Sequence, residues 1–213
     1  MENAVPIILL AFANDRQGQF LRSIAAEQQA ISTSLRETER AGRCDVVSLP
    51  NAGVSDIIRV FQEERGRVRI FHYGGHADGD QLHLNSSSGN VVDGQSLANF
   101  LGNQDDLELV FLNGCSTYGQ KDGLLAAGVK RVIITDKAIH DNAAQHFSSQ
   151  FYKSLATGMD IEAAFKEAAS GTLLHTGGDK RHLFWEDNEP EADDGVSRGR
   201  LNGVCFRGRA KSE

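Results

Sequence analysis

Cysteine, proline and tryptophan are scarce in this chain. Its 213 residues include three cysteines, Cys44, Cys115 and Cys205, an odd number at wide spacing. This pattern argues against a disulfide framework and against a C-x-x-C zinc clamp, and it favours reduced thiols in a cytoplasm. The seven histidines show no metal-ligand spacing with cysteines or carboxylates, so we predict no metal site and no cofactor.

An excess of positive charge and a long hydrophobic run are also missing. The formal net charge is -7, whereas a nucleic-acid surface needs a concentrated basic face, so no direct nucleic-acid partner is expected. The apolar run at 5–13 has about half the length that spans a bilayer, and no basic segment precedes it. We therefore expect no membrane partner. Glycine-rich phosphate loops of the G-x-G-x-x-G or G-x-x-x-x-G-K-S/T type are absent from the sequence, so a nucleotide-binding domain is remote.

Apolar runs of strand length alternate with segments of helical periodicity. Continuous runs predict buried strands at 6–12, 44–49, 68–73, 107–112 and 129–135. Apolar residues at helical spacing predict helices around 20–35, 57–61, 95–101, 123–127, 143–155 and 161–168. The segments 81–85 and 91–92 are typical of a hairpin. This alternation indicates an α/β fold with a mostly parallel central sheet.

The length of the chain favours a single domain, which we place at 1–207. The segment 186–194 holds six acidic residues and a proline, which predicts a solvated loop; a partner-binding role is the alternative. We expect a last edge strand at 201–206 and a basic tail at 208–213.

Two of the apolar runs end in glycine and a reactive side chain. Phe71-His72-Tyr73-Gly74-Gly75-His76-Ala77 presents His76, and Leu112-Asn113-Gly114-Cys115-Ser116-Thr117 presents Cys115. Reactive groups collect beyond the carboxyl ends of parallel strands, so the two side chains meet if their strands are neighbours.

An imidazole near a thiol can take its proton or stabilise the thiolate. Backbone N–H groups around Gly75, Ala77 and Gly114 could then stabilise an oxyanion, and glycines would let the backbone approach a substrate. The alternative is that Cys115 is a small buried apolar residue and His76 an ordinary hydrogen-bonded group.

These two segments resemble the catalytic boxes of the CHAT family, the caspase-like peptidases related to separase, caspases and gingipains. The resemblance extends over most of 5–170, including the Phe-Tyr-x-x-Leu-Ala-x-Gly that starts at residue 151. It implies a caspase-like three-layer sandwich with helices on both faces of the sheet, and a cysteine endopeptidase in which His76 is the general acid/base and Cys115 the nucleophile. Ala77 departs from the glycine that follows this histidine in caspases. His72 lies inside its strand, which favours a packing role.

The resemblance also gives expectations about substrates and partners. Asp136 or Asp141 would favour cleavage after Arg or Lys, although Asp141 also suits a helix N-cap. A protein substrate and an activating or sensor partner are expected, in regulated proteolysis of a prokaryotic defence or cell-death system. The alternative is an interaction module that keeps the fold with little or no turnover.

Overall fold

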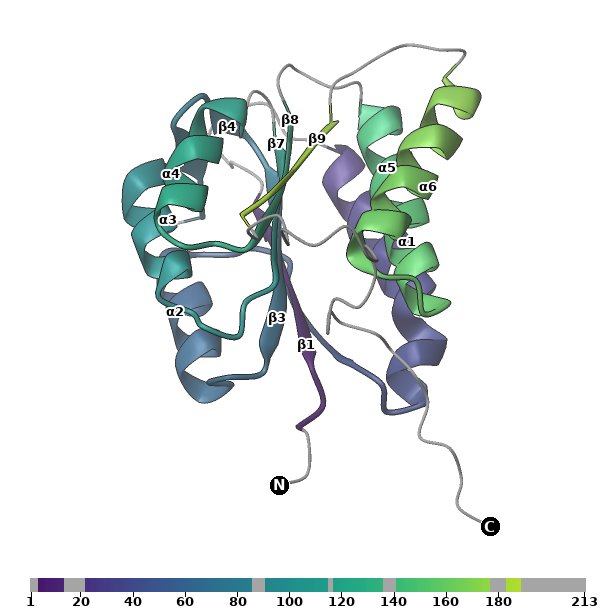
Figure 1. Ribbon diagram of the computed structural model, residues 1–213, viewed down its shortest axis with the longest axis horizontal. Coiled ribbons are helices and arrows are strands. Elements are labelled where there is room, and N and C mark those ends of the chain that lie inside the picture. The colour runs from purple at the N-terminus through teal and green to yellow at the C-terminus, as the bar shows by residue number, and fades with distance from the viewer. Residues whose placement is uncertain are drawn as a thin grey trace, which may run out of the picture.

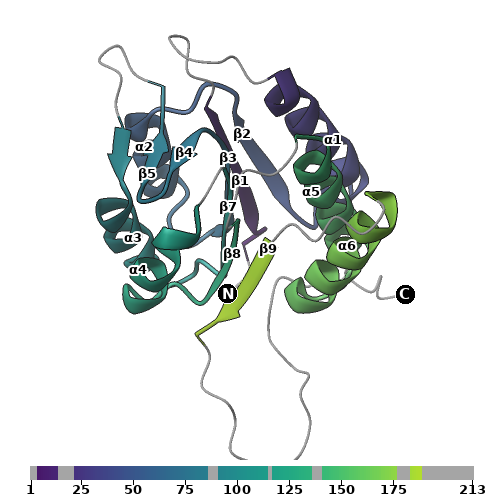
Figure 2. The same cartoon turned by 90° about the horizontal axis from the view of Figure 1, so that it is seen from above.

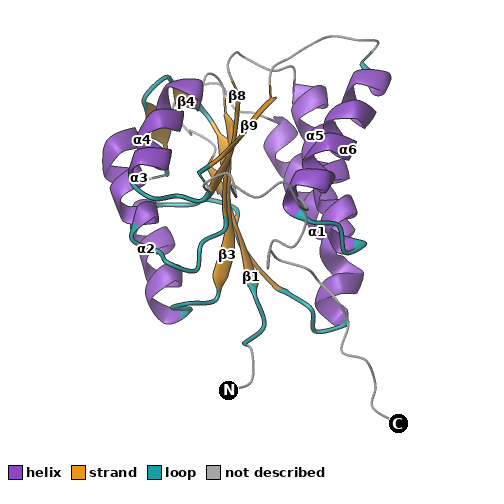
Figure 3. Cartoon of the chain, in the orientation of Figure 1, coloured by secondary structure: helices purple, strands orange, loops and turns teal. Residues whose placement is uncertain are grey.

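A six-stranded sheet forms the centre of the molecule (Figures 1 and 3). The computed structural model describes residues 4–13, 22–85, 91–114, 117–135, 141–176 and 183–188. The strands lie in the order β2-β1-β3-β7-β8-β9, and all neighbours are parallel except β8 and β9. Their bounds are β1 (Ile7–Ala13), β2 (Asp45–Leu49), β3 (Val68–Gly75), β7 (Leu109–Gly114), β8 (Arg131–Thr135) and β9 (Leu183–Asp187).

Helices cover both faces of this sheet, which confirms the predicted three-layer α/β sandwich (Figures 1 and 2). One face carries α2 (Val54–Glu63), α3 (Gly94–Gly102) and α4 (Lys121–Ala126), and the other carries α1 (Arg22–Arg40), α5 (Asp141–Ala156) and α6 (Ile161–His175). None of the helices in the described part of the chain is long and apolar enough to cross a lipid bilayer.

The strand β1 shows why its sequence is a continuous apolar run. All seven of its residues are buried, because helices lie over both faces. Leu9 and Ala11 belong to the core under α2, α3 and α4, whereas Leu10 and Phe12 belong to the core under α1, α5 and α6. Successive side chains of the strand point to opposite faces of the sheet, so β1 contributes residues to two separate cores.

A second, antiparallel sheet follows β3. It consists of β4 (Ala77–Asp78), β5 (Gln81–His83) and β6 (Val91–Asp93) in that order. The predicted hairpin is confirmed by the pairing of β5 with β6, and β4 is a strand that the sequence did not predict. A short 3-10 helix, η1 (Thr117–Gln120), leads from β7 toward α4.

The prediction of a solvated loop at 186–194 is wrong for its first two residues. Glu186 and Asp187 lie in β9, which pairs antiparallel with β8. Their carboxylates have cationic neighbours, since Glu186 Oε1 lies 3.6 Å from Lys121 Nζ and Asp187 Oδ2 lies 3.4 Å from Arg131 Nε. Paired charges and a Leu-Phe-Trp start make this acidic segment a strand. The remaining loop, the predicted edge strand at 201–206 and the tail at 208–213 lie outside the described residues.

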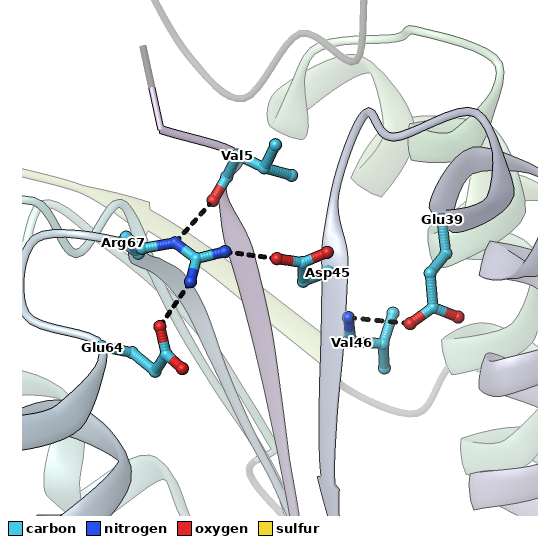
Figure 4. A network of polar contacts seen from close by, with 6 residues as sticks. All are labelled: Val5, Glu39, Asp45, Val46, Glu64 and Arg67. Carbon is cyan, nitrogen blue, oxygen red and sulfur yellow. Dashed lines mark hydrogen bonds and ion pairs between the residues drawn. The ribbon is translucent and has the colours of Figure 1, made fainter. Parts of the chain in front are cut away.

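An arginine network joins the amino ends of three strands (Figure 4). Arg67 Nε donates to the Val5 carbonyl oxygen at 3.1 Å, and the guanidinium also binds the carboxylates of Asp45 and Glu64. Val5 precedes β1, Asp45 begins β2 and Arg67 precedes β3. We call these four residues the Arg67 network; it lies at the end of the sheet opposite to the predicted reactive residues.

Candidate active site

The two strands that lead to the predicted reactive residues are neighbours. β3 pairs in parallel with β7, and the register ends with Gly75 opposite Gly114. In the sequence, His76 follows Gly75 and Cys115 follows Gly114. Cys115 itself lies outside the described residues. The condition on which the dyad prediction depends, adjacent strand ends at one edge of the sheet, is met.

The main chain of His76 is held from two sides. Its carbonyl oxygen accepts a hydrogen bond from the His83 N–H at 3.0 Å. The Tyr73 hydroxyl lies 2.6 Å from the same oxygen and 2.8 Å from the His83 carbonyl oxygen, and it can donate to either. The His76 side chain is partly exposed. An imidazole with a fixed backbone and an accessible ring has the properties that proton transfer to a substrate needs.

A second histidine lies beside His76. The ring centroids of His76 and His83 are 6.4 Å apart. His83 Nε2 lies 3.0 Å from Asp78 Oδ2, so the Asp78 carboxylate holds the His83 ring by its Nε2 atom. Neither His83 nor Asp78 was predicted from the sequence, although the seven residues from His76 to His83 are the spacing that the hairpin of β4 and β5 requires.

The segment after β7 is fastened to β8 by two buried threonines. Thr117 Oγ1 accepts from the Thr135 N–H at 2.9 Å and donates to the Leu112 carbonyl oxygen at 3.1 Å. Thr135 Oγ1 donates to the Gly114 carbonyl oxygen. The chain is therefore fixed immediately before and two residues after Cys115.

The glycines of both segments have a packing role. A Cβ on Gly74 would lie 2.6 Å from the Phe12 ring, one on Gly75 would lie 2.5 Å from the Tyr73 hydroxyl, and one on Gly114 would lie 2.9 Å from the Gly75 carbonyl oxygen. The space that each missing side chain leaves is occupied by this chain's own atoms. These glycines were predicted to allow close approach of a substrate, and the structure shows that packing within the chain also requires them.

His72 lies in the core, as the sequence analysis favoured. Its side chain is fully buried, and its ring packs on Phe111 at a centroid distance of 4.5 Å, with Phe12 and Tyr152 farther away. Of the two histidines in this segment, His76 is the one whose side chain is partly exposed.

Comparison with known proteins identifies the family. The family model of the CHAT domain matches residues 2–187, which is most of the chain. The chain belongs to the CHAT domain family. A search of curated proteins finds no match.

Solved structures with the same fold include two peptidases. The Drosophila initiator caspase Dronc superimposes with a TM-score of 0.55 at 11% identity, over 85% of this chain and 78% of the caspase. The Arg specific cysteine proteinase gingipain R superimposes with a TM-score of 0.56 at 13% identity, over 80% of this chain and 42% of gingipain R. These likenesses establish the caspase-like fold of this CHAT domain.

Of the two residues predicted to bind substrate in this CHAT domain, the structure describes the backbone of one. Asp136 lies outside the described residues. Asp141 is the first residue of α5, which agrees with a position at a helix N-terminus, and its side chain is outside the description. Ala77 is buried in β4, where it pairs with Leu82. Its Cβ lies 3.0 Å from the place that a Cβ on Gly114 would take, and Gly75 is the register partner of Gly114.

Metal ligands do not gather in the part of the CHAT domain that the structure describes. Within those residues there is no group of three or more His, Cys, Asp or Glu side chains that could hold a metal ion.

Proposed function

We propose that this CHAT domain is a cysteine endopeptidase with His76 and Cys115 as its dyad. The observation that carries the proposal is the register of β3 and β7, which ends at Gly75 and Gly114 side by side, one residue before each reactive side chain. The caspase-like fold, which the chain shares with a caspase and with a cysteine proteinase, supports it.

The reaction follows ordinary cysteine peptidase chemistry. The Cys115 thiolate attacks the carbonyl carbon of the scissile bond, and His76, protonated, gives its proton to the leaving amine as the C–N bond breaks. Water then attacks the thioester while His76 takes a proton from it, and the C–S bond breaks to release the carboxylic acid and restore the Cys115 thiolate beside protonated His76. Backbone N–H groups near Gly75, Ala77 and Cys115 stabilise the oxyanion, each contributing about 3 kcal/mol.

Labelling of Cys115 with a peptide carrying a thiol-reactive electrophile tests the dyad. We expect rapid modification of the natural chain and a rate at least about tenfold lower in His76→Ala, because general-base assistance contributes about 10²–10⁴-fold. Peptide mass spectrometry distinguishes Cys115 from Cys44, which is fully buried. An equal labelling rate in both proteins would reject the activated dyad and favour an interaction module with the same fold.

The substrate side of the proposal is cleavage after Arg or Lys, with Asp136 or Asp141 receiving the basic side chain. Gingipain R, which shares the fold, is an Arg specific cysteine proteinase. A peptide library in which the residue before the scissile bond is varied tests this preference. We expect peptides with Arg or Lys at that position to be cleaved fastest, and Asp136→Asn or Asp141→Asn to reduce the preference. A preference for acidic or small residues would reject it.

The setting of the proposal is regulated proteolysis inside a prokaryotic cell, in defence or cell-death signalling, with a protein substrate and an activating or sensor partner. Co-expression with proteins encoded next to this chain, followed by the labelling assay, tests the need for such a partner. A rate that no neighbouring protein changes would argue against activation by a partner.

A further inference from the structure

A carboxylate is buried in the apolar face of α1. Glu27 is 5% exposed and lies on the same side of the helix as Ile24 and Ile31, which pack into the core below the sheet. A buried carboxylate costs free energy unless hydrogen bonds compensate the loss of water, so its partners identify what it does.

The partners of Glu27 come from the sheet and from α5. Its Oε1 accepts from Asn113 Nδ2 at 2.6 Å and from Ser148 Oγ at 2.6 Å, and Asn113 Nδ2 also donates to Ser148 Oγ at 3.1 Å. His72 Nε2 lies 3.4 Å from the same Oε1. All four side chains are at least nine-tenths buried. We call Glu27, His72, Asn113 and Ser148 the Glu27 cluster.

The Glu27 carboxylate lies against the ends of both strands that lead to the dyad. Oε1 binds Asn113 of β7, which is two residues before Cys115. Oε2 would be 3.5 Å from a Cβ on Gly74 of β3, which is two residues before His76. Gly74 and Asn113 are direct neighbours in the sheet register. The carboxylate is therefore hydrogen-bonded to β7 and lies beside β3, in each case two residues before the reactive side chain.

We propose that Glu27 is a positioning residue that holds the ends of β3 and β7 in register and so sets the relative position of His76 and Cys115. Its effect on chemistry rests on the proposed peptidase function; its effect on the strand ends does not. A change in relative position of about 1 Å costs about 10²-fold in rate in other enzymes, so a link this close to the dyad has leverage.

Three variants separate the parts of this role. Glu27→Ala removes every bond of the carboxylate and leaves Asn113 Nδ2 with Ser148 alone. Glu27→Gln keeps an oxygen acceptor for Asn113 and Ser148 and removes the negative charge. Glu37→Ala is the matched control, because Glu37 is on the same helix, and its exposed carboxylate pairs with Arg40.

The first measurement is the rate of Cys115 alkylation by iodoacetamide as a function of pH, followed by peptide mass spectrometry on the full chain. We expect Glu27→Ala to react about tenfold more slowly at neutral pH and to show a pH profile different from that of the natural chain. Glu27→Gln should recover most of the natural rate, and Glu37→Ala should match the natural chain. A folded Glu27→Ala protein with the natural rate and pH profile overturns the proposal.

The second measurement distinguishes this proposal from the peptidase function. Amide hydrogen exchange at 74–76 and 113–114 should be faster in Glu27→Ala than in the natural chain, with β2 unchanged. If these amides exchange at the natural rate, the positioning role is overturned. If they exchange faster while His76→Ala leaves Cys115 reactivity unaltered, the link between the strands stands and the dyad falls.

A milder variant covers the case in which Glu27→Ala does not fold. Ser148→Ala removes one donor to the carboxylate and leaves the Asn113 bond. It should shift the alkylation rate and the exchange at 113–114 in the same direction by a smaller factor. No shift in either measurement would overturn the proposal.

Discussion

Gly75 is a position where a single methyl group cannot be accommodated. A Cβ there would lie 2.5 Å from the Tyr73 hydroxyl and 2.7 Å from the Ala13 carbonyl oxygen. The carbonyl belongs to the paired strand β1 and cannot rotate away. We expect Gly75→Ala to lower the free energy of unfolding by about 1–3 kcal/mol, measured by urea denaturation.

Gly171 provides the comparison for this variant. It lies inside α6, and a Cβ there would meet nothing within 4 Å. Because alanine has a higher helix propensity than glycine, Gly171→Ala should raise stability by up to about 1 kcal/mol. If both variants had the same urea midpoint, steric crowding would not be the reason why position 75 is a glycine.

At the scale of residues, the sequence supported the packing role of His72 and could not identify Glu27. The strand pattern places His72 between apolar neighbours, so burial follows from local information. Glu27 is separated from Asn113 by 86 residues and reaches it only when α1 crosses over the sheet. In a helix a lone glutamate is usually solvated, and nothing local marks this one as buried.

At the scale of elements, the link between η1 and β8 depends on one hydroxyl. Thr117 is fully buried and accepts the Thr135 N–H. Thr117→Val keeps the shape of the side chain and leaves that N–H without its acceptor, so we expect a loss of about 1–3 kcal/mol in unfolding free energy.

Thr157→Val tests whether the loss comes from burial. Thr157 follows α5 and is exposed, and its hydroxyl donates to the Ser154 carbonyl oxygen. In the valine variant a water molecule can replace the hydroxyl as the donor. We expect a change within about 0.5 kcal/mol. Similar losses for both variants in thermal or urea unfolding would contradict the proposed role of the Thr117 hydroxyl.

The pairing of α5 with α6 includes two stacked histidines that make it sensitive to acid. His146 and His175 have ring centroids 4.2 Å apart with nearly parallel planes. Burial, and then the charge of His175, lower the pKa of His146. The unfolded chain therefore binds more protons than the folded one as pH falls below about 6.5, and stability should drop through that range.

The variant His175→Gln isolates the contribution of the pair. It removes the second charge and keeps the burial of His146, so the drop in stability toward low pH should become smaller. Urea midpoints of both proteins at about pH 7.5 and about pH 5 measure it. An equal drop in both would exclude repulsion between the rings.

The elements themselves were predictable where apolar periodicity is strong. All five parallel strands were located from the sequence. β1 is a continuous apolar run that is covered on both faces, whereas the edge strand β2 is partly exposed along its whole length. The ends of β3 and β7 were set two residues too early, because their glycines interrupt the apolar pattern while the pairing continues to Gly75 and Gly114. β9 was missed because its acidic half indicates solvent, and its pairing with Arg131 and Lys121 is set by tertiary structure.

At the scale of the whole molecule, stability and reactivity can be separated along the sheet. The Arg67 network lies at the amino ends of β1, β2 and β3 (Figure 4). The candidate active site lies at the carboxyl ends of β3 and β7. Arg67→Met should lower the free energy of unfolding by about 1–2 kcal/mol, since its partners are partly exposed. Cys115 alkylation in the folded protein should keep the natural rate.

Arg40→Met is the matched control for this separation. Arg40 forms an exposed ion pair with Glu37 at 3.0 Å, which contributes little to stability. We expect no measurable change in unfolding or alkylation. A slower reaction of Cys115 in folded Arg67→Met would mean that the two ends of the sheet are coupled.

The reversed direction of β9 has a mechanical consequence. Its first residue, Leu183, pairs with Thr135 at the reactive end of β8, and its last residue, Asp187, pairs with Arg131 at the opposite end. Tension on the chain beyond Asn188 would act first on the pair of Asp187 with Arg131, and the residue pairs of β8 and β9 would then separate one after another. The rung beside Thr135 would be the last to open, so the end of the sheet that carries the chemistry is the part best shielded from a pull on that side of the molecule.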